Sequence, residues 1–165
     1  MVDIRHEQAT DASSIRQLLD EAFPGEPVGR LVDDLRDEGD LLLSLVAERD
    51  ARVIGQIGFS PVAIAPCSVR AVQLSPLAVD KAERRQGAGG ALVRAGIERC
   101  RDLGIDAILV LGGPAYYRRF GFDPALAAGL RSRWSGPHLM GLELSPGALH
   151  GCSFLALTPA FERLP

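Results

Sequence analysis

LSPLAVDKAERRQGAGGALV, the stretch from Leu74 to Val93, joins an apolar strand pattern to an apolar helical pattern through a glycine-rich loop. A helix that begins on glycines exposes unpaired backbone N–H groups at its positive end, and such groups bind anions. The stretch therefore predicts a strand over 71–80, an anion-binding loop after it, and a helix from about Gly89 to Leu103.

Three anion-binding loops compete for this glycine pattern. A P-loop needs a lysine directly after its last glycine, where this chain has Ala91. A dinucleotide-binding loop needs a third glycine where Leu92 stands. The pattern Arg/Gln-x-x-Gly-x-Gly is met by Arg84, Gly87 and Gly89, whose small residues let the backbone approach a pyrophosphate. A glycine-rich turn that binds nothing is the alternative to all three.

Pro76 lies in the middle of the strand predicted over 71–80. Proline cannot donate to a strand ladder, so a central strand that contains one is expected to be bulged or splayed. Leu77, Ala78 and Val79 would then offer free backbone groups to an extended, amide-containing ligand, as a sheet edge offers them to a peptide. A pyrophosphate site beside a site for such an arm describes coenzyme A.

The remaining hydrophobic patterns predict an α+β fold, with helices packed on a mixed sheet. Apolar residues at helical spacing predict one helix that opens at Thr10 and Asp11 and a second from Val28 to about Gly39. The other expected elements are strands over 2–7, 41–48, 52–64, 106–113, 138–144 and 153–157 and a short helix over 114–117.

The length, the net charge and the cysteine spacing argue against several classes of protein. The 165 residues suit one domain, and the net charge of -3 lacks the basic surplus of a nucleic-acid-binding protein. The first residues do not resemble a signal peptide, and the apolar stretches are too short to span a bilayer. Cys67, Cys100 and Cys152 have no CxxC spacing, so we expect reduced, mostly buried thiols in a cytoplasmic protein and neither a disulfide nor a metal site.

Together with LVLGGPAYYRRFGF from Leu109 to Phe122, the opening stretch resembles the GNAT N-acetyltransferase superfamily. It is most similar to a bacterial branch of predicted acetyltransferases with PLAV on the fourth strand and PAYYxRFGF after the fifth. The resemblance covers most of the chain and implies a single acetyltransferase-like domain over 1–165. It also implies a mixed, mostly antiparallel sheet that is splayed between strands 4 and 5, with helices on both faces and acetyl-CoA in the gap.

The resemblance implies a cofactor site on the strand and the loop. Leu77 and Val79 would pair through their backbone with the pantetheine arm and the thioester, and a backbone N–H near Val79 would stabilise the oxyanion. The loop would wrap the pyrophosphate, and no metal is expected. The expected acetyl-CoA-binding residues are Leu77, Ala78, Val79, Arg84, Arg85, Gln86, Gly87, Ala88, Gly89 and Gly90.

The resemblance also implies a tyrosine as general acid, at the position of Tyr117. Neighbouring residues on a helix point about 100° apart, so only one of Tyr116 and Tyr117 can face the thioester. The family pattern favours Tyr117, and a packing role for both is the alternative. The general base is not identified: Glu26, Glu48 and His138 are candidates, and a water relay would leave no trace in the sequence.

The expected function is transfer of an acetyl group from acetyl-CoA to a primary amine of a small molecule or peptide. The alternative is a non-catalytic module that senses acyl-CoA. A second copy of the chain, in a homodimer, is a further candidate partner, whereas no nucleic acid and no membrane is expected. A P-loop nucleotide hydrolase is disfavoured by the missing lysine.

Overall fold

The computed structural model describes all 165 residues, which form two compact units. The first unit consists of Met1–Phe59 and Pro76–Glu98, and the second of Ser60–Ser75 and Arg99–Pro165. The single domain expected over 1–165 stays a prediction.

The elements that the hydrophobic patterns predicted follow one another along the chain in the predicted order. Along the sheet their order is β1-β2-β3-β4-β5-β6, and β7 pairs with β3. Pairing is antiparallel between β1 and β2, β2 and β3, β3 and β7, and β5 and β6, and it is parallel between β4 and β5. The predicted α+β class with a mixed, mostly antiparallel sheet is therefore confirmed. The strands are β1 (Asp3–His6), β2 (Leu43–Arg49), β3 (Arg52–Ala65), β4 (Ala71–Val79), β5 (Ala107–Leu111), β6 (Leu139–Glu143) and β7 (Phe154–Ala156).

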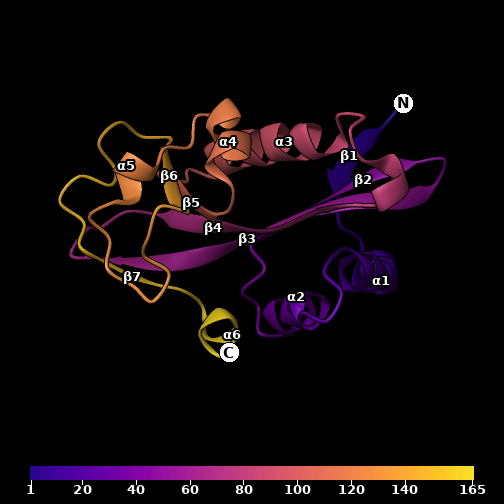
Figure 1. Cartoon of the computed structure of the whole chain (residues 1–165), viewed down its shortest axis with the longest axis horizontal. Coiled ribbons are helices and arrows are strands. Elements are labelled where there is room, and N and C mark those ends of the chain that lie inside the picture. Colours follow the sequence, from indigo (N-terminus) through magenta and orange to yellow (C-terminus); the bar gives the residue numbers. More distant parts are fainter. The chain divides into compact units, whose positions relative to one another are not determined.

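In the first unit, helices cover both faces of the strands, as expected. Helices α1 (Ala12–Ala22) and α2 (Val28–Asp37) lie on one face, and α3 (Ala88–Asp102), which continues into the second unit, lies on the other (Figure 1). The apolar positions spaced along α1 and α2 face the sheet, which is the burial that their periodicity predicted. Their core cluster contains Ile15, Leu18, Leu19, Val32, Val46 and Ala78.

Helix α1 begins at Ala12, with Asp11 at its N-cap position as the sequence suggests, although the Asp11 side chain makes no capping hydrogen bond to this helix. Thr10 and Asp11 also lie inside a 3-10 turn, η1 (Ala9–Asp11). Asp11 instead accepts a hydrogen bond from the backbone N–H of Gln8 at 2.7 Å. The Asp11 side chain therefore stabilises the 3-10 turn that precedes the helix.

In the second unit, β4 pairs with β5 over only part of its length. The parallel register joins Ala71–Leu74 to Ala107–Val110, and it ends two residues before Pro76. All four of these β5 residues are buried, as the nearly continuous apolar run predicted.

Short elements complete the second unit. Helix α4 (Pro114–Tyr117) and the turn η3 (Arg118–Phe120) follow β5, and α4 has the predicted bounds. Helices α5 (Pro124–Ala127) and α6 (Pro159–Glu162) were not predicted, because one turn of helix is too short to show a hydrophobic period. No helix of the chain has the length and apolar character needed to cross a membrane.

The expectation of three reduced thiols was wrong for two of them. Cys67, between β3 and β4, forms a disulfide with Cys152, just before β7. The two residues are 85 positions apart, so their spacing gave no signal of the pairing. Cys100 is free and buried, and its burial raises the pKa of the thiol to about 12. Because disulfides are rare in reducing compartments, the bond gives no support to the predicted cytoplasmic location.

Candidate functional site

The predicted anion-binding loop lies in the first unit, between the end of β4 and the start of α3. The backbone N–H of Asp80 donates to the carbonyl of Ile54 on β3 at 2.7 Å, which fixes the strand end to the sheet. The Asp80 carboxylate accepts from the N–H of Ala82 at 3.0 Å and so caps the turn η2 (Lys81–Glu83). This capping aspartate was not predicted, although an aspartate at the end of a strand is a common turn signal.

Arg84 ties the loop back to the strand. Its Nε donates to the backbone carbonyl of Val79, the last residue of β4, at 3.0 Å. Arg85 and Gly87 have φ values of 65° and 90°, so the backbone turns sharply on its way to the helix. Two of the predicted cofactor-binding residues, Val79 and Arg84, are thus in direct contact.

Helix α3 presents its first backbone N–H groups at the end of this loop. The N–H of Ala91 donates to the carbonyl of Gly87 at 3.0 Å, which places Gly87 at the cap position. The N–H groups at 88–90 then precede the first internal hydrogen bond and have no acceptor within the helix. Together with the helix dipole they make a corner whose chemistry suits an anion.

A pocket of about 270 Å³ lies beside this corner. Its positively charged wall consists of Lys81 and Arg84, and Val79 lines it at the strand end. The opposite wall comes from α1 and the loop that follows it. These lining residues are Leu18, Glu21, Ala22 and Pro24.

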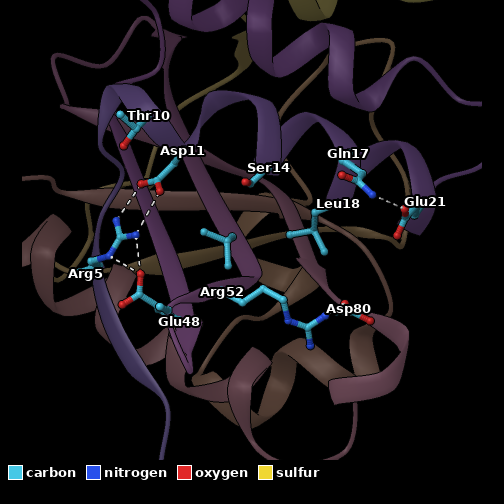
Figure 2. Close-up of a pocket in the computed structure, with 12 residues that line it drawn as sticks. Arg5, Thr10, Asp11, Ser14, Gln17, Leu18, Glu21, Glu48, Arg52 and Asp80 are labelled. Atoms are coloured by element: carbon cyan, nitrogen blue, oxygen red, sulfur yellow. Dashed lines mark hydrogen bonds and ion pairs between the residues drawn. The ribbon is translucent and has the colours of Figure 1, made fainter.

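A second pocket, of about 360 Å³, shares Leu18, Glu21 and Asp80 with the first. Figure 2 shows Arg5 in its wall between the carboxylates of Asp11 and Glu48, with contacts of 2.7 and 2.8 Å. The hydrogen bond from Arg5 lowers the pKa of the Asp11 carboxyl from its ordinary value. Since Glu48 is already engaged by a guanidinium, it is a poor general base, although the sequence left it as a candidate.

The tyrosine pair lies in the second unit, and the two rings have different surroundings. Tyr117 contacts Tyr116 edge-on, with ring centroids 5.0 Å apart, and the buried Phe122, at 5.8 Å. A Cβ added at Gly112 would come within 2.5 Å of the Tyr117 ring, so the ring needs a glycine beneath it. Burial, and to a lesser degree Tyr116, raises the pKa of the Tyr117 hydroxyl to about 12.

Tyr116 has a different environment. Its ring packs against Phe120, at 5.4 Å, and the guanidinium of Arg119 lies 4.7 Å from its centroid. The cation-π contact explains one of the paired arginines that followed the tyrosines in the sequence. Tyr116 is therefore packed against its neighbours, and Tyr117 is the tyrosine of the two whose pKa is raised by burial.

No group of three or more His, Cys, Asp or Glu side chains is arranged to hold a metal ion. The residues expected to bind the cofactor form one continuous segment of the first unit, from the end of β4 to the start of α3. The arrangement can hold an elongated ligand that carries phosphates at the helix N-terminus.

Comparison with known proteins identifies the family. A model of the acetyltransferase (GNAT) family matches residues 12–122. The uncharacterized N-acetyltransferase YhbS of Escherichia coli K12 is 42% identical over 134 residues, which cover 81% of this chain and 80% of that protein.

Two solved structures have the same fold over almost the whole chain. The crystal structure of E. coli YhbS in complex with CoA has a TM-score of 0.92 at 38% identity, covering 99% of this chain and 93% of that one. A GNAT family acetyltransferase from Brucella melitensis in complex with acetyl-CoA has a TM-score of 0.83 at 34% identity, covering 98% of both. With a family match over more than half of its length and a relative at 42% identity, the chain belongs to the GNAT acetyltransferase family and is an N-acetyltransferase.

Proposed function

We propose that this chain transfers the acetyl group of acetyl-CoA to a primary amine of a small molecule or peptide, as one catalytic domain over 1–165. The proposal rests on the corner where β4 ends and α3 begins, because the N–H groups at 88–90 have no acceptor within the helix. The crystallisation of two similar proteins with CoA and acetyl-CoA supports the same cofactor here.

We assign different tasks to the residues of this corner. Leu77, Ala78 and Val79 pair through their backbone with the amides of the pantetheine arm. Because the Arg84 side chain already donates to the Val79 carbonyl, it holds the loop against the strand. The pyrophosphate is bound mainly by backbone N–H groups of the remaining loop residues, Arg85, Gln86, Gly87, Ala88, Gly89 and Gly90.

The chemistry is direct attack of a neutral amine on the thioester carbonyl. A backbone N–H near Val79 stabilises the oxyanion, and one such donor typically contributes about 3 kcal/mol. Tyr117 donates its proton to the departing thiolate. With a pKa of about 12, its hydroxyl keeps that proton at neutral pH, which supports the role of acid.

Calorimetric titration with acetyl-CoA and with CoA tests the cofactor assignment, and we expect saturable binding of both. CoA release is then measured with a lysine-containing peptide, spermidine, tyramine and kanamycin, which represent four classes of primary amine. The absence of saturable heat at millimolar acetyl-CoA would refute the proposal. Tight binding without CoA release for a broader amine panel would favour the acyl-CoA sensor instead.

A further inference from the structure

His138 is fixed to the end of β5 by both its backbone and its side chain. It directly precedes β6, whose Leu139 is the register partner of Leu111 on β5. The N–H of Gly112 donates to the backbone carbonyl of His138 at 3.1 Å. In return, the imidazole Nδ1 lies 3.1 Å from the carbonyl oxygen of the same Gly112.

This second contact determines where the imidazole can accept a proton. A carbonyl oxygen only accepts hydrogen bonds, so the Nδ1 of His138 must carry the hydrogen that joins it to Gly112. In the neutral ring the lone pair is then on Nε2. His138 is exposed, and no protein group is hydrogen-bonded to that nitrogen, so Nε2 is open to a ligand.

Gly112 is also the residue beneath the ring of Tyr117. A Cβ at this position would lie within 2.5 Å of the ring carbon Cε2 of Tyr117. The Tyr117 ring and the His138 imidazole therefore both lie next to Gly112, the ring on the side of its absent Cβ and the imidazole at its carbonyl. All three residues belong to the second unit, and a side chain suited to accept a proton shares this glycine with one suited to give it.

Four carboxylates of this unit have structural partners. Asp106, Asp123, Glu143 and Glu162 each accept a hydrogen bond from a backbone N–H, at 2.8–3.0 Å. Each bond gives the carboxylate a structural role and engages one of its two oxygens. Imidazole, in contrast, is the most common general base of enzymes.

We propose that His138 is the general base that deprotonates the acceptor amine, with the Gly112 carbonyl fixing its tautomer. This role rests on the proposed acetyl transfer. The acceptor ammonium gives one proton to Nε2, and the freed nitrogen lone pair forms a bond to the thioester carbon. The C–S bond breaks with its electron pair on sulfur, which takes the proton of Tyr117. The second amine proton returns through solvent to the Tyr117 oxygen, and the imidazolium releases its proton to water.

His138→Asn separates this role from a purely structural one. The asparagine Nδ2 can donate to the Gly112 carbonyl in place of the imidazole Nδ1, but the side chain has no basic nitrogen. With the most active amine of the panel above, we expect kcat to fall by about 10²-fold or more, while the Kd for acetyl-CoA changes less than about twofold. His138→Ala should lose as much activity and recover part of it when free imidazole is added.

His150→Asn is the matched control, because His150 is an exposed histidine of the same unit outside the proposed chemistry. It should keep the parent kcat. Parent-like turnover of His138→Asn would overturn the inference, and so would a loss in His138→Ala that imidazole does not restore. A parent chain that releases no CoA with any amine would instead refute acetyl transfer itself and, with it, the need for a base.

Discussion

The ring of Tyr117 packs over Gly112 and against the buried Phe122, and this burial raises the pKa of its hydroxyl to about 12. A phenol with this pKa remains protonated throughout the range in which most enzymes are assayed. Tyr117 can therefore act as an acid throughout this range. We expect no decrease of kcat between pH 6 and 9 that is caused by deprotonation of Tyr117.

Tyr117→Phe should remove the acid and keep the ring packing. We expect kcat to fall by about 10²–10⁴-fold with little change in the Kd for acetyl-CoA, because only the hydroxyl is lost. Steady-state kinetics and calorimetry on the same preparation measure both quantities. Tyr116→Phe is the control, and equal activity losses in the two variants would contradict the assignment.

The ion pair of Asp11 with Arg5 makes stability depend on pH in a defined direction. The hydrogen bond from Arg5 lowers the pKa of Asp11 below its ordinary value of 3.8. Such a group stabilises the fold above its unfolded pKa, and this contribution is lost as pH falls through the lower, folded pKa.

Asp11→Asn should therefore flatten the acid limb of the stability curve. The variant should be less stable than the parent at pH 7, and this difference in stability should narrow as the pH falls below the ordinary Asp pKa of 3.8. Urea unfolding at a series of pH values measures this. Asp37→Asn, at an exposed position outside the recorded ion pairs, should follow the parent curve. If the difference in stability between the parent and Asp11→Asn is the same at all pH values, the link between this ion pair and the pH dependence is refuted.

At the scale of elements, α3 packs on the sheet through a glycine at its centre. A Cβ at Gly96 would come within 2.5 Å of ring atoms of Phe59, which is fully buried and cannot move aside. Helix α3 therefore lies as close to strand β3 as the two backbones and the Phe59 ring allow.

Gly96→Ala tests this contact because two effects oppose each other. Alanine favours the helix by about 1 kcal/mol, whereas overpacking a rigid core costs about 1–3 kcal/mol. We expect a net loss of stability in chemical denaturation. In the background of Phe59→Leu, the same change should cost less or become stabilising, and equal costs in both backgrounds would show that the two residues do not interact.

The elements differ in how far the sequence could predict them. Long periodic segments such as α1, α3 and β5 were found within a few residues, because burial follows their hydrophobic pattern. The loop after β4 was recognised from its glycines, and Val79 and Arg84 do share a pocket. The contact between His138 and Gly112 joins residues that are 26 positions apart in the sequence. It depends on the pairing of β5 with β6, which no local sequence pattern predicts.

At the scale of the whole molecule, the disulfide links two distant parts of the chain. Cross-linking Cys67 to Cys152 closes a loop of 85 residues and restricts the unfolded ensemble. The third cysteine, Cys100, is buried and has a raised pKa, so it should not react with thiol reagents in the native state.

Counting thiols tests this pattern directly. Without reductant, we expect no reactive thiol in the native protein and one after unfolding, rising to three when the unfolded protein is reduced. The double variant Cys67→Ser/Cys152→Ser should lose about 2–4 kcal/mol of stability, and reductant should destabilise the parent by a similar amount. Three thiols in the unfolded, unreduced protein would refute the bond.

Strands β3 and β4 and helix α3 each begin in one compact unit and end in the other. Neither unit is thus encoded by an uninterrupted portion of the gene, and the chain passes between them at three points. No single truncation can yield either half intact, and a chimaera that exchanges one half with a homologue would need several crossovers. Insertions and deletions during evolution are consequently expected in the loops within each half and not at these three passages.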